Sequence, residues 1–64
     1  MRIDRVKLVS ELARQDMTQK ALAEKSGVSR ATINYIRGGK SCTAEIGEKI
    51  AKALNVDIAN LLEN

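Results

Sequence analysis

Apolar residues near the start of the chain recur at the spacing of an α-helix. The repeating positions are Val6, Val9, Leu12 and Ala13, with Leu8 beside them. Side chains three or four residues apart share one side of a helix, and Asp4 directly before this stretch is suited to the N-cap. We therefore predict a first helix over about residues 5–15, with this stripe as its apolar side.

Hydroxyl side chains mark the starts of two helices in the middle of the chain. Thr18 precedes a stretch rich in helix formers over about 19–25, and Ser29 precedes a second helix over 30–37. The glycine pair at 38–39 follows directly. Because glycine adopts the left-handed conformation without steric penalty, this pair is expected to end the helix.

The last third of the chain predicts two more helices. Thr43 is suited to cap the first and Asn55 to end it, whereas Asp57 is suited to cap a short fifth helix. Their apolar positions are Ile46, Ile50 and Leu54, and then Ile58, Leu61 and Leu62. Because no stretch alternates with the period of a strand, we predict an all-α fold, a compact bundle of five short helices in one domain over residues 1–64.

The two middle helices have the layout of a helix-turn-helix. About four residues separate them, and these include Gly27, where the turn is expected to need a positive φ. The apolar residues that would form the core of this unit are Leu22, Ala23, Val28, Ile33 and Ile36.

The helix over 30–37 carries chemistry suited to DNA bases on the side opposite its isoleucines. At about 100° per residue, that side presents Ala31, Asn34 and Tyr35, with Arg30 and Arg37 flanking it. Asparagine suits adenine, arginine suits guanine, and an alanine methyl can contact the methyl group of thymine. Since the sole aromatic side chain points away from the apolar side, contact with a partner is favoured over a half-buried structural role.

The composition excludes several kinds of chemistry. The 64 residues include no His and one Cys, so neither a Ser-His-Asp nor a Cys-His site can form, nor a zinc site of the usual ligands. The apolar runs are too short for a membrane-spanning helix. We expect a small, non-enzymatic, cytoplasmic domain without catalytic residues, metal, cofactor, membrane contact or an evident small-molecule effector. Cys42 is interpreted as a plain loop residue and not as a redox switch.

The net charge of +3 is unevenly distributed along the chain. Residues 18–43 contain five Lys or Arg and one acidic residue, whereas residues 44–64 contain two lysines and four acidic residues. A solvated surface with randomly placed signs explains so small an excess about as well as a partner does. A basic middle segment is nevertheless what binding to phosphates requires.

The run T-Q-K-A-L-A-E-K-S-G-V-S-R-A-T-I over residues 18–33 resembles the helix-turn-helix of the Cro/C1-type (XRE) family of bacterial and phage regulators. The resemblance continues through G-G-K at 38–40 and I-A-K-A-L-N-V at 50–56, and covers roughly residues 5–62. It implies a lambda-repressor-like DNA-binding domain that regulates transcription.

The resemblance also implies which residues contact DNA. Gln19 matches the family's phosphate-contacting glutamine, at a helix start that carries partial positive charge. The implied base readers are Arg30, Ala31, Asn34 and Tyr35. The residues expected at phosphates are Thr18, Gln19, Ser29, Thr32, Arg37, Lys40 and Ser41. For Ser29 and Thr32 the matching family positions touch either the DNA backbone or a neighbouring base.

The chain departs from the family pattern at two places. Leu12 and Arg37 stand where many members pair an arginine with a glutamate, and the joint change leaves no unpaired buried charge and frees Arg37 to meet phosphate. Gly47 stands where many members have a large apolar residue, and we interpret Ile46 as its substitute in the core.

The leading hypothesis is a transcriptional repressor that binds a double-stranded DNA operator in a bacterial nucleoid. Since one helix reads too few base pairs, a homodimer on a two-fold site is expected. Whether the dimer forms in solution or only on DNA is left open by the sequence. The candidate dimer contacts are Ile58, Leu61 and Leu62, of which at least some must be core. Two alternatives are an antitoxin-like protein-interaction module, which predicts an exposed apolar patch, and a sequence-independent DNA binder.

Overall fold

A side chain caps the N-terminus of each helical element of the chain within residues 1–63. In the computed structural model, which describes residues 1–63, Asp4 Oδ1 accepts from the backbone N–H groups of Val6 and Lys7 at 2.8 and 3.2 Å. Four more side chains accept from a first-turn N–H in the same way: Thr18, Ser29, Thr43 and Asp57. These bonds satisfy donors that a helix start leaves unpaired, and all five predicted caps are confirmed.

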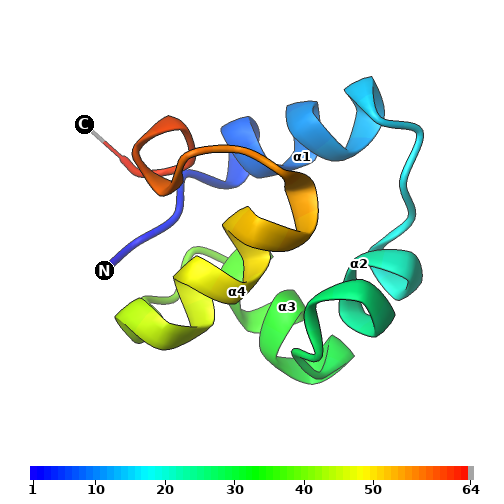
Figure 1. The fold of residues 1–64 in the computed structure, drawn as a ribbon. Coiled ribbons are helices and arrows are strands. Elements are labelled where there is room, and N and C mark those ends of the chain that lie inside the picture. The colour runs from blue at the N-terminus through cyan, green and yellow to red at the C-terminus, as the bar shows by residue number, and fades with distance from the viewer. Residues whose placement is uncertain (64) are drawn as a thin grey trace.

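Four α-helices and one 3-10 turn follow from these starts (Figure 1). They are α1 (Arg5–Arg14), α2 (Gln19–Ser26), α3 (Arg30–Arg37), α4 (Ala44–Leu54) and η1 (Ile58–Asn60). The predicted all-α bundle is confirmed, and α2 packs against both α3 and α4. The predicted number of five helices is one too many, because the short fifth segment, η1, is a single 3-10 turn. It ends where Leu61 O accepts from Asp4 N of the N-terminal segment.

Residues in the left-handed conformation end α2 and α4. Gly27 has a φ of 76° and Asn55 a φ of 57°, so the positive φ predicted at Gly27 and the stop predicted at Asn55 are confirmed. After α3 the left-handed residue is Gly39, with a φ of 94°, because Gly38 still has a helical conformation. The turn at Gly27 sends the chain directly from α2 into α3.

The buried side of α1 differs from the apolar stripe in the sequence. Leu8 and Leu12 are buried, whereas Val6 is 68% and Val9 41% exposed, and Ala13 also lies on the surface. Only one side of α1 packs against the bundle, and there the two larger leucines, one turn apart, remove more apolar surface from water. The valines of the stripe therefore face outward.

The N-terminal segment completes the core in a way that the sequence pattern did not predict. Ile3 is fully buried and forms an isolated antiparallel bridge with Leu62. Asp4 N donates to Leu61 O at 2.7 Å, and Glu63 N donates to Arg2 O at 3.2 Å. Both ends of the described chain therefore lie side by side (Figure 1). A bridge of one residue pair has no periodicity, so a pattern search misses it.

Gly47 lies buried on α4 where the side chain of Met1 crosses the helix. A methyl group added at Gly47 would overlap Met1 Sδ and would lie 3.4 Å from Ile58 Cδ1. Ile46 is only half-buried at the edge of the core. The space at Gly47 is therefore filled by Met1 and Ile58, which come from two other segments, and not by Ile46 as the sequence suggested.

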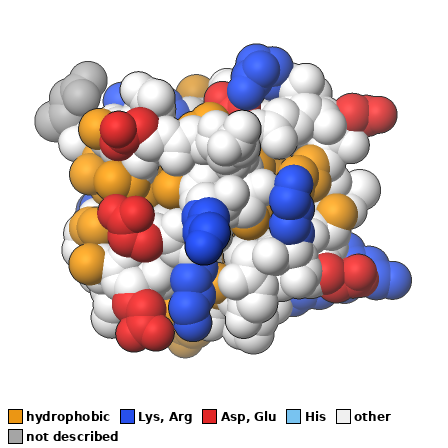
Figure 2. Space-filling view, in the orientation of Figure 1, with side chains coloured by type: hydrophobic (Ala, Val, Ile, Leu, Met, Phe, Trp, Pro, Cys, Tyr) orange, Lys and Arg blue, Asp and Glu red, His pale blue; other side chains and the backbone are white. Residues whose placement is uncertain are grey.

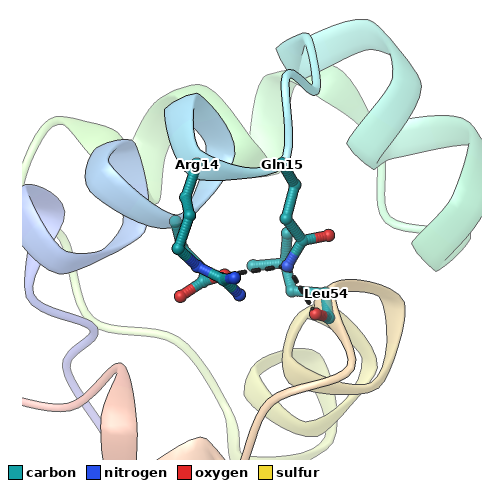
Figure 3. Close-up of polar contacts among 4 residues, drawn as sticks. Arg14, Gln15 and Leu54 are labelled. Carbon is teal, nitrogen blue, oxygen red and sulfur yellow. Dashed lines mark hydrogen bonds and ion pairs between the residues drawn. The ribbon is translucent and has the colours of Figure 1, made fainter.

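Polar side chains tie the end of α1 to the end of α4 (Figure 3). Gln15 Nε2 donates to Leu54 O at 2.7 Å and to Glu11 Oε2 at 2.8 Å, and Arg14 Nε donates to the same Glu11 oxygen at 2.9 Å. The hydrogen bond from Arg14 lowers the pKa of Glu11 most, and the hydrogen bond from Gln15 lowers it further. One carboxylate thus holds Gln15 in place to bind a last-turn carbonyl of α4.

Candidate nucleic-acid interface

Helix α3 has one side in the core and one in solvent. Ile33 and Ile36 are 0% and 1% exposed, so these two side chains anchor α3 in the core. The outward residues are all exposed, namely Arg30, Ala31, Asn34 and Tyr35. Tyr35 is 65% exposed, so the half-buried structural role that the sequence left open does not apply. These are the four residues predicted to read bases, and the structure places them together on the surface.

The starts of α2 and α3 are free of acidic residues. Neither helix has Asp or Glu in its first turn, so no side chain there offsets the partial positive charge of the helix start. Ser29 Oγ accepts from Thr32 N at 3.1 Å and donates to Thr32 Oγ1 at 2.9 Å. Thr18 Oγ1 accepts from Ala21 N at 3.0 Å. Thr18, Ser29 and Thr32 thus shape the helix starts in addition to their predicted place at phosphates.

Gln19 connects α2 to α3 through its side chain. Arg37 Nη1 donates to Gln19 Oε1, and Gln19 Nε2 donates to Asn34 Oδ1. The sequence predicted that each of these three residues contacts DNA separately. In the structure they are connected to each other by hydrogen bonds. Their spacing in the sequence carries no sign of this, because the contact depends on the angle between two helices.

The segment after α3 is folded back onto the end of that helix. Lys40 N donates to Tyr35 O at 3.1 Å and Gly39 N donates to Ile36 O at 3.0 Å. Lys40 and Ser41 are both exposed. A shallow hollow beside them is lined by Ala31, Asn34, Tyr35, Gly38 and Lys40. The loop thus places a cation and a hydroxyl group at the edge of the outward side of α3.

The cations near α3 lack acidic partners within residues 1–63. The ion pairs within residues 1–63 join Arg2 to Glu63, Arg14 to Glu11 and Lys49 to Glu45. None of these pairs involves residues 18–43. On the face formed by α4, Lys or Arg side chains lie among Asp or Glu side chains (Figure 2). The basic segment predicted from the sequence is therefore left with its charge free to pair with an anion.

The remaining chemistry of the described chain is sparse. No group of three or more His, Cys, Asp or Glu residues within 1–63 could hold a metal ion, and no helix there is long and apolar enough to cross a membrane. Burial raises the pKa of the half-buried Cys42 thiol. A higher pKa leaves less thiolate, which is the reactive form.

A side of α1 that the sequence assigned to the interior also lies near this surface. Arg5, Val6, Val9 and Ser10 line an open groove together with Arg37. The signal that could have revealed it is the pair Leu8 and Leu12, two larger apolar side chains one turn apart on the same helix.

Comparison with known families agrees with this architecture. The family model described as Helix-turn-helix matches residues 10–61. No curated protein sequence and no solved structure shows a significant match to the chain. The chain belongs to the Cro/C1-type helix-turn-helix family. It is thus a DNA-binding protein of the transcription-regulator kind, from a family of DNA-binding regulators and not of enzymes.

Proposed function

We propose that the protein is a transcriptional repressor that recognises a specific operator in double-stranded DNA. The observation that carries the proposal is the two-sided character of α3. Ile33 and Ile36 anchor the helix, while four exposed side chains with base-edge chemistry occupy its other side. A helix held in this way can enter the major groove with its outward side against the bases.

Phosphate contacts on both sides of α3 would hold it in register. On one side stand the start of α2, with Thr18 and Gln19, and the guanidinium of Arg37. On the other side stand Lys40 and Ser41 in the loop after α3, while Ser29 and Thr32 lie at the start of α3 itself. Contacts of this kind position a protein on the duplex, and base contacts supply the specificity.

Two copies of the chain are proposed to bind one two-fold operator. A single recognition helix reads only a few base pairs, so a dimer with half-sites about 34 Å apart makes a longer site. Leu61 is 1% exposed and belongs to the core, so of the candidate dimer contacts the half-buried Ile58 and Leu62 remain. Bound at a promoter on the bacterial nucleoid, such a dimer would repress by excluding other proteins from the DNA.

The protein-interaction alternative is less well supported. It requires a contiguous apolar patch, and the exposed large apolar side chains on α1 are two valines, Val6 and Val9, beside the cations Arg5 and Arg37. Isolated exposed apolar residues are common on monomeric proteins. The side of α3 that carries Arg30 and Asn34 offers more specific chemistry, and it favours DNA.

The test begins with selection of bound sequences from random DNA. On the selected site, Arg30→Ala should lose affinity by a factor equivalent to about 1–3 kcal/mol and relax the preference at one base pair. Lys40→Ala should weaken binding to all sequences alike and make the salt dependence less steep. Equal losses for both variants on every sequence would show that Arg30 does not read a base. Failure to select any sequence would overturn the proposal and leave the sequence-independent binder and the protein-interaction module.

A further inference from the structure

The hydrogen bonds from Arg37 to Gln19 and from Gln19 to Asn34 have a fixed direction. A guanidinium group carries donors and no acceptor, so the atom of Gln19 that faces Arg37 is its oxygen, Oε1. The nitrogen of the same amide then faces Asn34, which turns its own oxygen toward it. Arg37 thereby sets the orientation of two amides in series.

The direction of this relay decides what Asn34 presents to DNA. An unrestrained asparagine suits adenine because its oxygen accepts and its nitrogen donates on the same base edge. Here Oδ1 faces Gln19, so Nδ2, on the opposite side of the amide, is the atom turned away from α2. Asn34 is exposed, and it therefore offers a donor to the major groove.

The surface next to Asn34 has a hollow in which a methyl group of a base can lie. The hollow beside it is lined by Ala31 and Tyr35, with Gly38 and Lys40 completing its wall. In the major groove thymine presents an acceptor, O4, next to a methyl group. Guanine presents acceptors without a methyl, adenine presents its N7 acceptor beside an amino group without a methyl, and cytosine presents only a donor. Thymine is thus the base whose edge matches both the donor and the hollow.

We propose that the Arg37–Gln19–Asn34 relay makes Asn34 a reader of thymine. Asn34 Nδ2 donates to O4, and the methyl group packs between Ala31 and the ring of Tyr35. Arg37 and Gln19 act through Asn34 and are positioning residues for this contact. The inference rests on the proposed function, because it specifies one base of the proposed operator.

Gln19→Glu is the variant that reverses the relay. A carboxylate only accepts, so it would still bind Arg37 but would take a hydrogen bond from Asn34 Nδ2 and turn Asn34 Oδ1 toward DNA. Arg37→Glu should also turn Asn34 Oδ1 toward DNA. Its carboxylate would accept from Gln19 Nε2, which reverses the amides of Gln19 and Asn34. The second variant keeps the test informative if the first fails to fold.

Modified bases test separately the packing of the thymine methyl group and the hydrogen bond to O4. Each thymine of the selected half-site is replaced in turn by uracil, which removes only the methyl group, and by 5-methylcytosine opposite guanine, which keeps the methyl and exchanges O4 for an amino group. At one position, uracil should cost the parent protein about fourfold in affinity. 5-methylcytosine should cost at least about tenfold there.

The readout is the ratio of affinities for thymine and 5-methylcytosine at that position. In Gln19→Glu and Arg37→Glu we expect the ratio to fall to about one or below, although both variants bind all DNA more weakly because they add negative charge. Asn60→Asp on η1 is the matched control, since it makes the same amide-to-carboxylate change far from α3 and should keep the ratio of the parent.

The outcomes separate this inference from the proposed function. If the parent selects a specific site but no thymine shows the preference, or if folded Gln19→Glu keeps the parental ratio, the relay does not set the base and the proposal is wrong. A merely structural role of Gln19 would lower affinity for both bases equally. If the parent selects no sequence at all, the proposed function itself fails.

Discussion

Single side chains in this protein act mainly by completing the hydrogen bonds of helix ends. Thr18 and Ser29 each occupy one backbone donor at a helix start, and Gln15 reaches a carbonyl at the end of another helix. The caps were predictable because they bond within three residues of themselves. The contact of Gln15 with Leu54 spans 39 residues of chain and could not be predicted from local sequence.

Glu11 should make the protein sensitive to acid. Its lowered pKa means that its contribution to folding is present above the ordinary glutamate value of 4.5 and is lost as the pH falls through the lower pKa of the folded state. Urea unfolding between about pH 3 and 7 should therefore show a smaller loss of stability on acidification for Glu11→Gln than for the parent.

Glu48→Gln on the exposed side of α4 is the control for this experiment, because Glu48 takes part in none of the ion pairs of residues 1–63. Its pH profile should follow that of the parent below neutral pH. Parallel profiles for the parent and Glu11→Gln would show that the hydrogen bonds from Arg14 and Gln15 do not stabilise the fold.

Among the helices, α1 shows the limit of periodicity as a guide. Its sequence contains two apolar stripes, one through Val6 and Val9 and one through Leu8, with Leu12 in both. The stripes are turned relative to each other by less than the width of a helix face. Which of them is buried depends on where α3 and the N-terminal segment lie, and that is decided by packing.

Replacing both Val6 and Val9 by serine should change the free energy of unfolding by less than about 0.5 kcal/mol per site, because both side chains are exposed. Leu8→Ala, one residue away, should cost about 2–5 kcal/mol because it leaves a cavity in the core. Thermal or urea unfolding measures both. Similar losses for the two variants would mean that the valines are packed after all.

The double valine variant also tests the role of this side of α1. Under the proposed function it should bind the selected operator with the affinity of the parent, since DNA contacts come from α2, α3 and the following loop. A large loss of operator affinity in a folded variant would place α1 within the DNA interface.

At the scale of the whole molecule, charge and size determine how the protein can act. Within residues 1–63, the five Lys or Arg residues of segment 18–43 take part in no ion pair. Over α4, acidic and basic side chains lie beside one another (Figure 2). Under the proposed function this basic segment meets the DNA phosphates. Under the proposed function one helix, α3, reads the bases, so a long operator requires a second copy.

Sedimentation with operator DNA should detect two protomers on a two-fold site and one on an isolated half-site. Loss of affinity with salt should be steeper on the full site, because each protomer neutralises about five phosphates and log K falls by about 0.9 per phosphate for each unit of log salt. One protomer bound to the full site, with the salt dependence of the half-site, would exclude the dimer.

The sequence by itself determined the four α-helices, the five side-chain caps, the turn at Gly27 and the two sides of α3. Each depends on residues within about one helical turn of each other, where spacing and side-chain chemistry decide the local conformation. The family resemblance added the expected DNA contacts, and the match over residues 10–61 establishes the family.

Only the tertiary structure decided how distant segments meet. It selected Leu8 over Val6 on α1, filled the space at Gly47 with Met1, and placed Ile3 in the core. It also joined Arg37 to Gln19 and Gln19 to Asn34 across two helices. These contacts follow from the angles at which helices pack, which no local pattern encodes.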